Sequence, residues 1–151
     1  MNQIVSQDSM QRALDEYFAS LKTIQQGTFN AMLDPQLISC SFREKKLQTA
    51  VLLQSWMVNP SGNMHGGIAA SVLDFTMGIL SRMCNDGKLT PTVTMTIDYI
   101  RSSKAGKRLI VEAECIKHGN HLSYITAKAW NEDAPDKQIL SASGTYFTGL
   151  N

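Results

Sequence analysis

The feature that most constrains the fold is the run from Ile68 to Met83, which contains no proline and consists mostly of small or apolar residues. Its larger apolar side chains recur at helical spacing on two faces, so the predicted helix is apolar almost all round. Such a helix is buried either inside a fold or in a membrane. Asp74 and Arg82 argue against the membrane, because both side chains would be costly at mid-bilayer. The run therefore predicts a soluble protein whose other elements wrap around an internal helix.

A turn-forming stretch leads directly into this helix. Residues 59–62 read Asn-Pro-Ser-Gly, which favours a turn, and His65, Gly66 and Gly67 follow where the helix should begin. Paired glycines are poor helix formers, but they let another molecule come close to the backbone. The free N–H groups of a first helical turn suit an anion or a developing oxyanion. The alternative is that the glycines only permit tight packing and that His65 caps the helix.

Asp74 places a carboxylate in the middle of the apolar helix, where it requires a partner. One interpretation is a structural ion pair with Arg82 or Arg101. The other is a functional group in a binding or catalytic site. Asp74 considered alone does not decide between them, but the pattern in which it lies does.

That pattern, N-x-x-G-x-x-H-G-G-x-x-x-x-x-x-D, resembles the signature of the hotdog-fold acyl-CoA thioesterases, in the branch similar to phenylacetyl-CoA thioesterases. The resemblance continues through residues 92–101 and covers roughly residues 37–148. It implies an α+β hotdog fold, in which an antiparallel sheet wraps around a long central helix. The signature is matched without a gap at Asn59, Gly62, His65, Gly66, Gly67 and Asp74.

The remaining segments fit this architecture within one domain, residues 1–151. An extra amphipathic helix is predicted over residues 9–26, with Asp8 or Ser9 as its cap and Gly27 at its end, followed by a loop over residues 28–36. A generic α+β sandwich is the structural alternative. The alternation of apolar and polar residues, interrupted by turn formers, predicts strands over residues 37–43, 47–58, 90–100, 107–117, 121–131 and 138–148.

Composition narrows the classes of function. A net charge of +1 gives no broad basic surface for nucleic acid. Three scattered cysteines, with no close pair and no metal-type spacing, indicate reduced thiols and no metal site. No charged-then-apolar leader is seen at the N-terminus. We therefore expect a cytoplasmic protein that neither binds nucleic acid nor enters a membrane, and that needs no cofactor.

The resemblance implies hydrolysis of a thioester to a free acid and CoA. The N–H of Gly66 would polarise the carbonyl, and Asn59 would add a donor or hold the attacking water. Asp74 would be the general base or the nucleophile. Thr92 would position the water, and His65 would orient the motif.

A second group of residues is predicted to contact the substrate. Gly67 is assigned to substrate binding, and a cluster of basic residues follows the third long strand and would meet the CoA phosphates. A solvated hairpin end is the alternative for this cluster, and Asn120 stands where the family often has a basic residue, so an acyl carrier protein thioester stays open. Met, Leu and Phe side chains of the helix are expected to line the acyl pocket. The basic cluster comprises Arg101, Lys104, Lys107 and Arg108.

The spacing of the motif predicts an assembly. Gly66 and Asp74 are eight positions apart, which is about 12 Å along one helix. A single carbonyl cannot be within hydrogen-bond reach of both, so Asp74 should serve a carbonyl held by another subunit. We therefore expect a homodimer or homotetramer with active sites between subunits, as the family also implies. A non-catalytic acyl-CoA-binding hotdog module is the competing function, and a dehydratase of the same fold is a weaker third.

Overall fold

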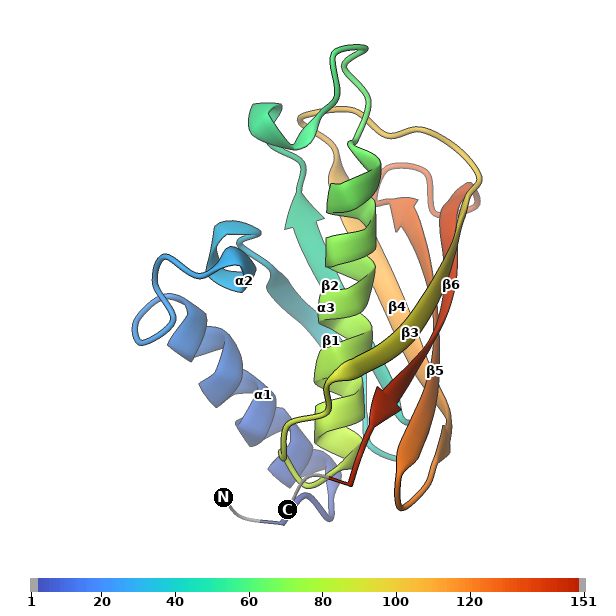
Figure 1. The fold of residues 1–151 in the computed structure, drawn as a ribbon. Helices are drawn as coiled ribbons and strands as arrows, with labels where there is room; N and C mark the ends of the chain where they lie inside the picture. Colours follow the sequence, from blue (N-terminus) through green and yellow to red (C-terminus); the bar gives the residue numbers. More distant parts are fainter. Residues whose placement is uncertain (1–2, 150–151) are drawn as a thin grey trace.

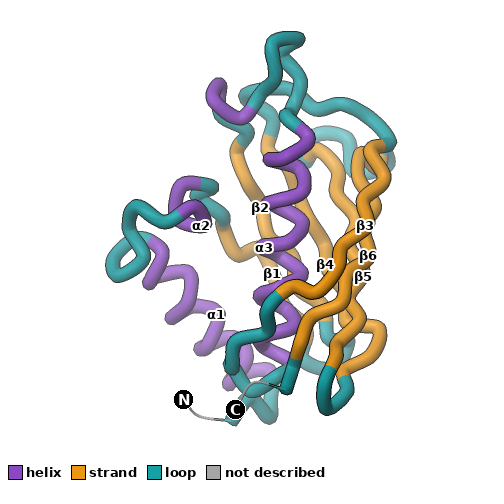
Figure 2. Tube along the Cα trace, viewed as in Figure 1, coloured by secondary structure: helices purple, strands orange, loops and turns teal. Residues whose placement is uncertain are grey.

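A computed structural model describes residues 3–149 and contains one six-stranded antiparallel sheet that curves around a long helix (Figure 1). The expected α+β arrangement, with an extra N-terminal helix, is confirmed. Figure 2 shows the sheet running behind and to the right of the central helix, with the N-terminal helix to the left, where it packs on β1. The elements in chain order are α1 (Gln7–Leu21), α2 (Phe29–Met32), β1 (Gln36–Ser41), β2 (Lys46–Leu52), a 3₁₀ turn (Ser55–Met57), α3 (Gly66–Cys84), β3 (Thr92–Tyr99), β4 (Arg108–His118), β5 (Leu122–Asn131) and β6 (Gln138–Phe147).

The strand order in the sheet is β1-β2-β4-β5-β6-β3, and every neighbouring pair is antiparallel. Consecutive strands β4, β5 and β6 form a meander in the middle. The connection through α3 carries the chain from β2, near one edge, to β3 at the opposite edge. The first half of α3 lies beside this edge strand, with Gly66 bonded to Tyr99 and Asp74 bonded to Thr92.

Burial of α3 organises the core. The helix is long and apolar enough to cross a membrane by length and composition alone, but most of it is buried within this fold. Val72, Leu73, Met77 and Leu80 are completely buried. They face the inward side chains of the sheet, which alternate along each strand as a half-buried sheet requires.

Hydroxyl pairs tie the buried helix to the sheet. Thr49 of β2 and Thr76 of α3 are both fully buried, and their hydroxyl oxygens are 2.7 Å apart. The Thr76 hydroxyl also donates to the carbonyl of Val72 at 3.0 Å. Ser81 and Ser123 make a second buried pair at 2.6 Å between α3 and β5. Each hydroxyl on the helix thus has a partner, as buried polar groups require.

The N-terminal helix begins and ends earlier than predicted. Ser6 is the cap, and it exchanges hydrogen bonds with Ser9, which is the third residue of the helix rather than its cap. The helix ends at Leu21 because Ser20 and Thr23 bond back to helix carbonyls, which competes with helix continuation. Gly27, with φ +83°, lies in the turn that follows. The predicted loop contains the short helix α2.

The second strand is shorter than predicted. It ends at Leu52, which is paired with Arg108, the first residue of β4. Two more backbone hydrogen bonds join Leu53 to Gly106 and Lys107 before the chain leaves the sheet. The chain then forms the 3₁₀ turn, which places Met57 in the core. The other strands start or end within a few residues of their predicted limits.

Two of the three cysteines lie close together in the fold. Cys84, the last residue of α3, hydrogen-bonds Cys115 of β4. This hydrogen bond, together with burial, raises the pKa of Cys84, whereas the same hydrogen bond lowers the pKa of Cys115. Both are free thiols, in agreement with the expected reduced state. Their spacing in the sequence gives no sign of the contact, because the two residues meet only through the packing of α3 on the sheet.

The Thr49–Thr76 pair gives an asymmetric prediction for stability. Thr76→Val should cost about 1–3 kcal/mol of unfolding free energy, because it leaves the buried Thr49 hydroxyl without a partner. Thr49→Val should cost less, because Thr76 still donates to Val72. Adding Thr49→Val to Thr76→Val should restore stability, measured by urea unfolding at equilibrium. A double variant as unstable as the sum of the two would contradict this account.

Candidate active site

The start of α3 is shaped by His65. This residue is the helix cap, and its exposed side chain accepts a hydrogen bond at Nδ1 from the N–H of Gly67 at 3.0 Å. Its own N–H donates to the carbonyl of Met57 at 2.9 Å, which fixes the loop to the core. The predicted orienting role of His65 agrees with this geometry. The N–H of Gly67, assigned to substrate binding, is instead occupied by the cap.

Gly66 is the first residue of α3, and its N–H has no acceptor within residues 3–149. Its carbonyl accepts from the Tyr99 hydroxyl at 3.1 Å. A Cβ at position 66 would lie 3.6 Å from the Tyr99 ring, which is ordinary contact, whereas one at position 67 would lie 3.1 Å from Nδ1 of His65. Packing within one chain therefore does not require a glycine at 66. The interpretation that Gly66 serves only tight packing loses its support.

Asn59 organises the turn before the helix. Its Oδ1 accepts from the N–H groups of Ser61 and Asn63, at 3.0 and 3.2 Å. Its carbonyl accepts from Gly62, whose φ of +74° is readily adopted only by glycine. The side-chain Nδ2 of Asn59 has no partner in the described part of the chain. It is the atom that remains for the predicted donor role.

Asp74 is half-buried, and one of its oxygens is held by two hydroxyl donors. Thr92 of β3 donates to Oδ1 at 2.8 Å and Tyr146 of β6 donates to the same atom at 3.0 Å. Oδ2 has no protein partner among residues 3–149. The carboxylate is thus fixed in place with one oxygen still able to accept a proton or a water.

The ion-pair interpretation of Asp74 was wrong within the described residues. No lysine, arginine or histidine nitrogen lies within 4.0 Å of its carboxylate there. Arg82 donates through Nε to the carbonyl of Gly87 at 2.6 Å. Arg101 donates to the carbonyl of Gln138 at 2.6 Å. Hydroxyl groups, not a cation, stabilise this carboxylate.

Tyr146 is a residue of the site that was not predicted from the sequence. It is completely buried and stands directly opposite Thr92 in the register of β3 and β6. Burial raises the pKa of Tyr146, and so do the charge of Asp74 and the hydrogen bond to it, so the phenol stays protonated and donates. A signal was present: Tyr146 shares one face of the strand with Leu140, Ala142 and Gly144, and a tyrosine on such an apolar face needs a partner for its hydroxyl.

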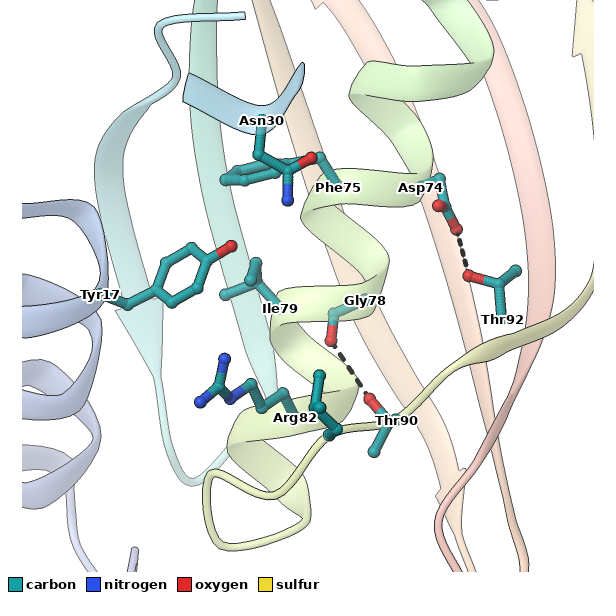
Figure 3. Close-up of a pocket in the computed structure, with 10 residues that line it drawn as sticks. Tyr17, Asn30, Asp74, Phe75, Gly78, Ile79, Arg82, Thr90 and Thr92 are labelled. Atoms are coloured by element: carbon teal, nitrogen blue, oxygen red, sulfur yellow. Dashed lines mark hydrogen bonds between the residues drawn. The ribbon is translucent and has the colours of Figure 1, made fainter. Parts of the chain in front are cut away.

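A cleft of about 170 Å³ opens beside Asp74 (Figure 3). The helix contributes Phe75, Gly78 and Ile79 to it, as well as a charged residue, Arg82. Methionines were expected to line an acyl pocket, but Met77 and Met83 are buried in the core. The complete lining is Tyr17, Asn30, Asp74, Phe75, Gly78, Ile79, Arg82, Leu89, Thr90 and Thr92.

Two members of the predicted phosphate-binding cluster are neutralised. Arg108 forms an ion pair with Glu132, and Lys107 forms one with Asp133. Both partners lie in the turn between β5 and β6, which the sheet brings alongside. Lys104 and Arg101 have no acidic partner within 4.0 Å in residues 3–149. The backbone of Lys104 forms a β-bridge with Asn63 of the motif loop.

A curved antiparallel sheet around one long central helix defines the hotdog class of folds, and here that helix also carries the glycine pair and the carboxylate of the motif. The chain belongs to the thioesterase superfamily, whose family model matches residues 61–136, half of its length. This confirms the resemblance drawn from the motif.

Individual relatives are distant. Mouse acyl-coenzyme A thioesterase 13 is 26% identical over 89 residues, which span 58% of this chain and 63% of the mouse protein, less than two thirds of its length. The structure of zebrafish thioesterase superfamily member 2 matches with a TM-score of 0.80 and 20% identity, covering 96% of this chain and 99% of that one. A Streptococcus mutans protein bound to acetyl-CoA matches with a TM-score of 0.67 and 20% identity, covering 75% and 86%. At these identities, the structural matches establish the fold.

Proposed function

We propose that this protein is an acyl-CoA thioesterase that hydrolyses a thioester to a free carboxylic acid and CoA. The observation that carries the proposal is the Asp74 carboxylate on the wall of a cleft, fixed through Oδ1 and with no partner for Oδ2 in the described part of the chain. Superfamily membership and the curated acyl-CoA thioesterase relative support it. A module that only binds acyl-CoA needs the cleft but gains nothing from a carboxylate beside the thioester.

The chain supplies groups for each step of hydrolysis. The N–H of Gly66, with Nδ2 of Asn59, polarises the thioester carbonyl and stabilises the oxyanion. Asp74 takes a proton from the attacking water as the new C–O bond forms. The C–S bond then breaks, and the CoA sulfur leaves as a thiol with that proton. If Asp74 instead attacks the carbonyl, water hydrolyses the resulting anhydride in a second step.

The site is shared between two chains in this proposal. Gly66 and Asp74 lie on one unbroken helix about 12 Å apart along its axis. β3 is an edge strand that runs beside α3, with Thr92 at its start bonded to Asp74 and Tyr99 at its end bonded to Gly66. An antiparallel pairing of two such edges would set the start of one β3 beside the end of the other. It would bring Asp74 close to Gly66 of the partner subunit, in a homodimer or in a homotetramer built from such dimers.

The role of Asp74 is tested with Asp74→Asn, which keeps the acceptor for Thr92 and Tyr146 but cannot take a proton. Thiol release from a panel of acyl-CoA chain lengths should fall about 10²- to 10⁴-fold, with the melting temperature retained. Asp136→Asn, on an exposed turn, is the matched control and should leave the rate unchanged. If Asp74→Asn releases thiol at the wild-type rate, Asp74 is not a catalytic residue. Binding of acyl-CoA by the wild type without thiol release would favour the binding module.

The donor at Gly66 is tested with proline, because proline is well tolerated at the first position of a helix and has no N–H. His65 has φ −65° and ψ 138°, which suits a residue before proline. Gly66→Pro should keep the fold and lower kcat about 10²- to 10³-fold. Gly66→Ala retains the N–H, so its loss of turnover should be smaller than that of Gly66→Pro. The remaining loss would come from the added methyl group, which crowds the substrate carbonyl. Equal, large losses of rate and melting temperature in both variants would instead support a packing role.

Sharing of the site is tested by mixing Gly66→Pro and Asp74→Asn chains after dissociation and reassociation. A mixed dimer holds one doubly damaged site and one intact site, so activity should return to about a quarter of the wild-type value at random pairing. Mass measurement confirms subunit exchange. If exchange occurs and no activity returns, both residues of each site belong to one chain.

A further inference from the structure

The cleft beside Asp74 is polar at the end away from the carboxylate. Three helices supply this polar end: Tyr17 from α1, Asn30 from α2 and Arg82 from α3. Figure 3 shows the Tyr17 hydroxyl and the Asn30 amide directed into the space beside α3, with the Arg82 guanidinium below them. A pocket for a plain alkyl chain would have no use for these groups, because each loses water when the chain enters.

Arg82 is half-buried, and its guanidinium is held in one orientation. Nε donates to the carbonyl of Gly87 at 2.6 Å, and Cζ lies 5.5 Å from the centre of the Tyr17 ring. Its Nη atoms make no hydrogen bond, and no carboxylate lies within 4.0 Å of it, in the described part of the chain. A guanidinium presented in this way suits a carboxylate, which it can bind through two parallel hydrogen bonds.

Tyr17 completes the polar end as a neutral donor. Burial raises its pKa, although the hydrogen bond with Asn30 and the charge of Arg82 act in the opposite direction. Its ring packs against Phe18 and Phe75, with centroids 5.9 and 6.2 Å away. The hydroxyl is therefore fixed by the aromatic packing that also forms one wall of the cleft.

The path between the two ends is short and mostly apolar. Asp74 and Arg82 are eight residues apart, about 12 Å along the axis of α3. Phe75, Gly78 and Ile79 line the interval, and the Thr90 hydroxyl donates to the Gly78 carbonyl there at 3.5 Å. An acyl group with its carbonyl at Asp74 would thus run past Gly78 and bring its far end to Arg82.

We propose that the preferred substrates are ω-carboxyacyl thioesters, whose distal carboxylate is bound by Arg82 with the help of Tyr17 and Asn30. This inference rests on the proposed thioesterase function and assigns its substrate class. The competing explanation is that Arg82 only caps the C-terminal end of α3 through Gly87 and packs on Tyr17. A structural role of that kind would affect all substrates alike.

The test compares acyl-CoAs in pairs of equal chain length: glutaryl with pentanoyl, adipoyl with hexanoyl, and suberoyl with octanoyl. The wild type should have the higher kcat/KM for the carboxylated member of at least one pair. Arg82→Gln should lower kcat/KM for that member roughly tenfold to a hundredfold, as for loss of a charge-assisted hydrogen bond, and should change the value for its unbranched monocarboxylic partner much less. Lys88→Gln removes an exposed cation near the same end of α3 and is the matched control.

Asn30→Leu provides a variant that does not touch the end of α3, and it should shift preference toward the monocarboxylic series. Arg82→Lys keeps the charge and should retain part of the selectivity. The inference is overturned if the wild type shows no preference for a carboxylated substrate, or if Arg82→Gln lowers both members of a pair equally. In either case hydrolysis of the monocarboxylic series would leave the thioesterase proposal standing, whereas absence of thiol release from every substrate would refute that proposal itself.

Discussion

The packing of α3 into the curved sheet is the interaction on which the rest of the structure depends. The helix is too apolar to be stable in water, and the sheet has an inner face that needs to be covered. Buried apolar side chains provide the attraction, and the hydroxyl pairs Thr49–Thr76 and Ser81–Ser123 set its position. Gly66 and Asp74 lie on this same helix, so the packing of the helix on the sheet also determines where these two residues lie.

Sheet register then determines the environment of the carboxylate. Thr92 and Tyr146 are opposite each other across β3 and β6, and both donate to Oδ1 of Asp74. A slip of one residue would turn one of these side chains to the other face of the sheet. The irregularity between Thr92 and Thr94 lies at this point, where a bulge can re-aim a side chain. The site therefore depends on strand pairing as much as on the motif.

The sequence was sufficient for the overall architecture because periodicity and turn formers are local signals. The helix start at Gly66 and the strands from β3 to β6 follow from them. Features that depend on distant partners were not accessible: Tyr146 meets Asp74 across 72 residues of chain, and Arg108 meets Glu132 through the sheet. The end of α1 was misplaced because hydroxyl side chains, which also occur inside helices, here turn back onto its carbonyls.

The length of α3 has an evolutionary consequence. Asp74 and Arg82 lie about 12 Å apart along the helix, beyond the range of about 7–10 Å within which substitutions usually influence one another. Residues at the Arg82 end of the cleft can therefore be substituted during evolution without disturbing hydrolysis at Asp74. A lineage could exchange one acyl preference for another through few substitutions, each tolerated separately, while retaining the same catalytic apparatus.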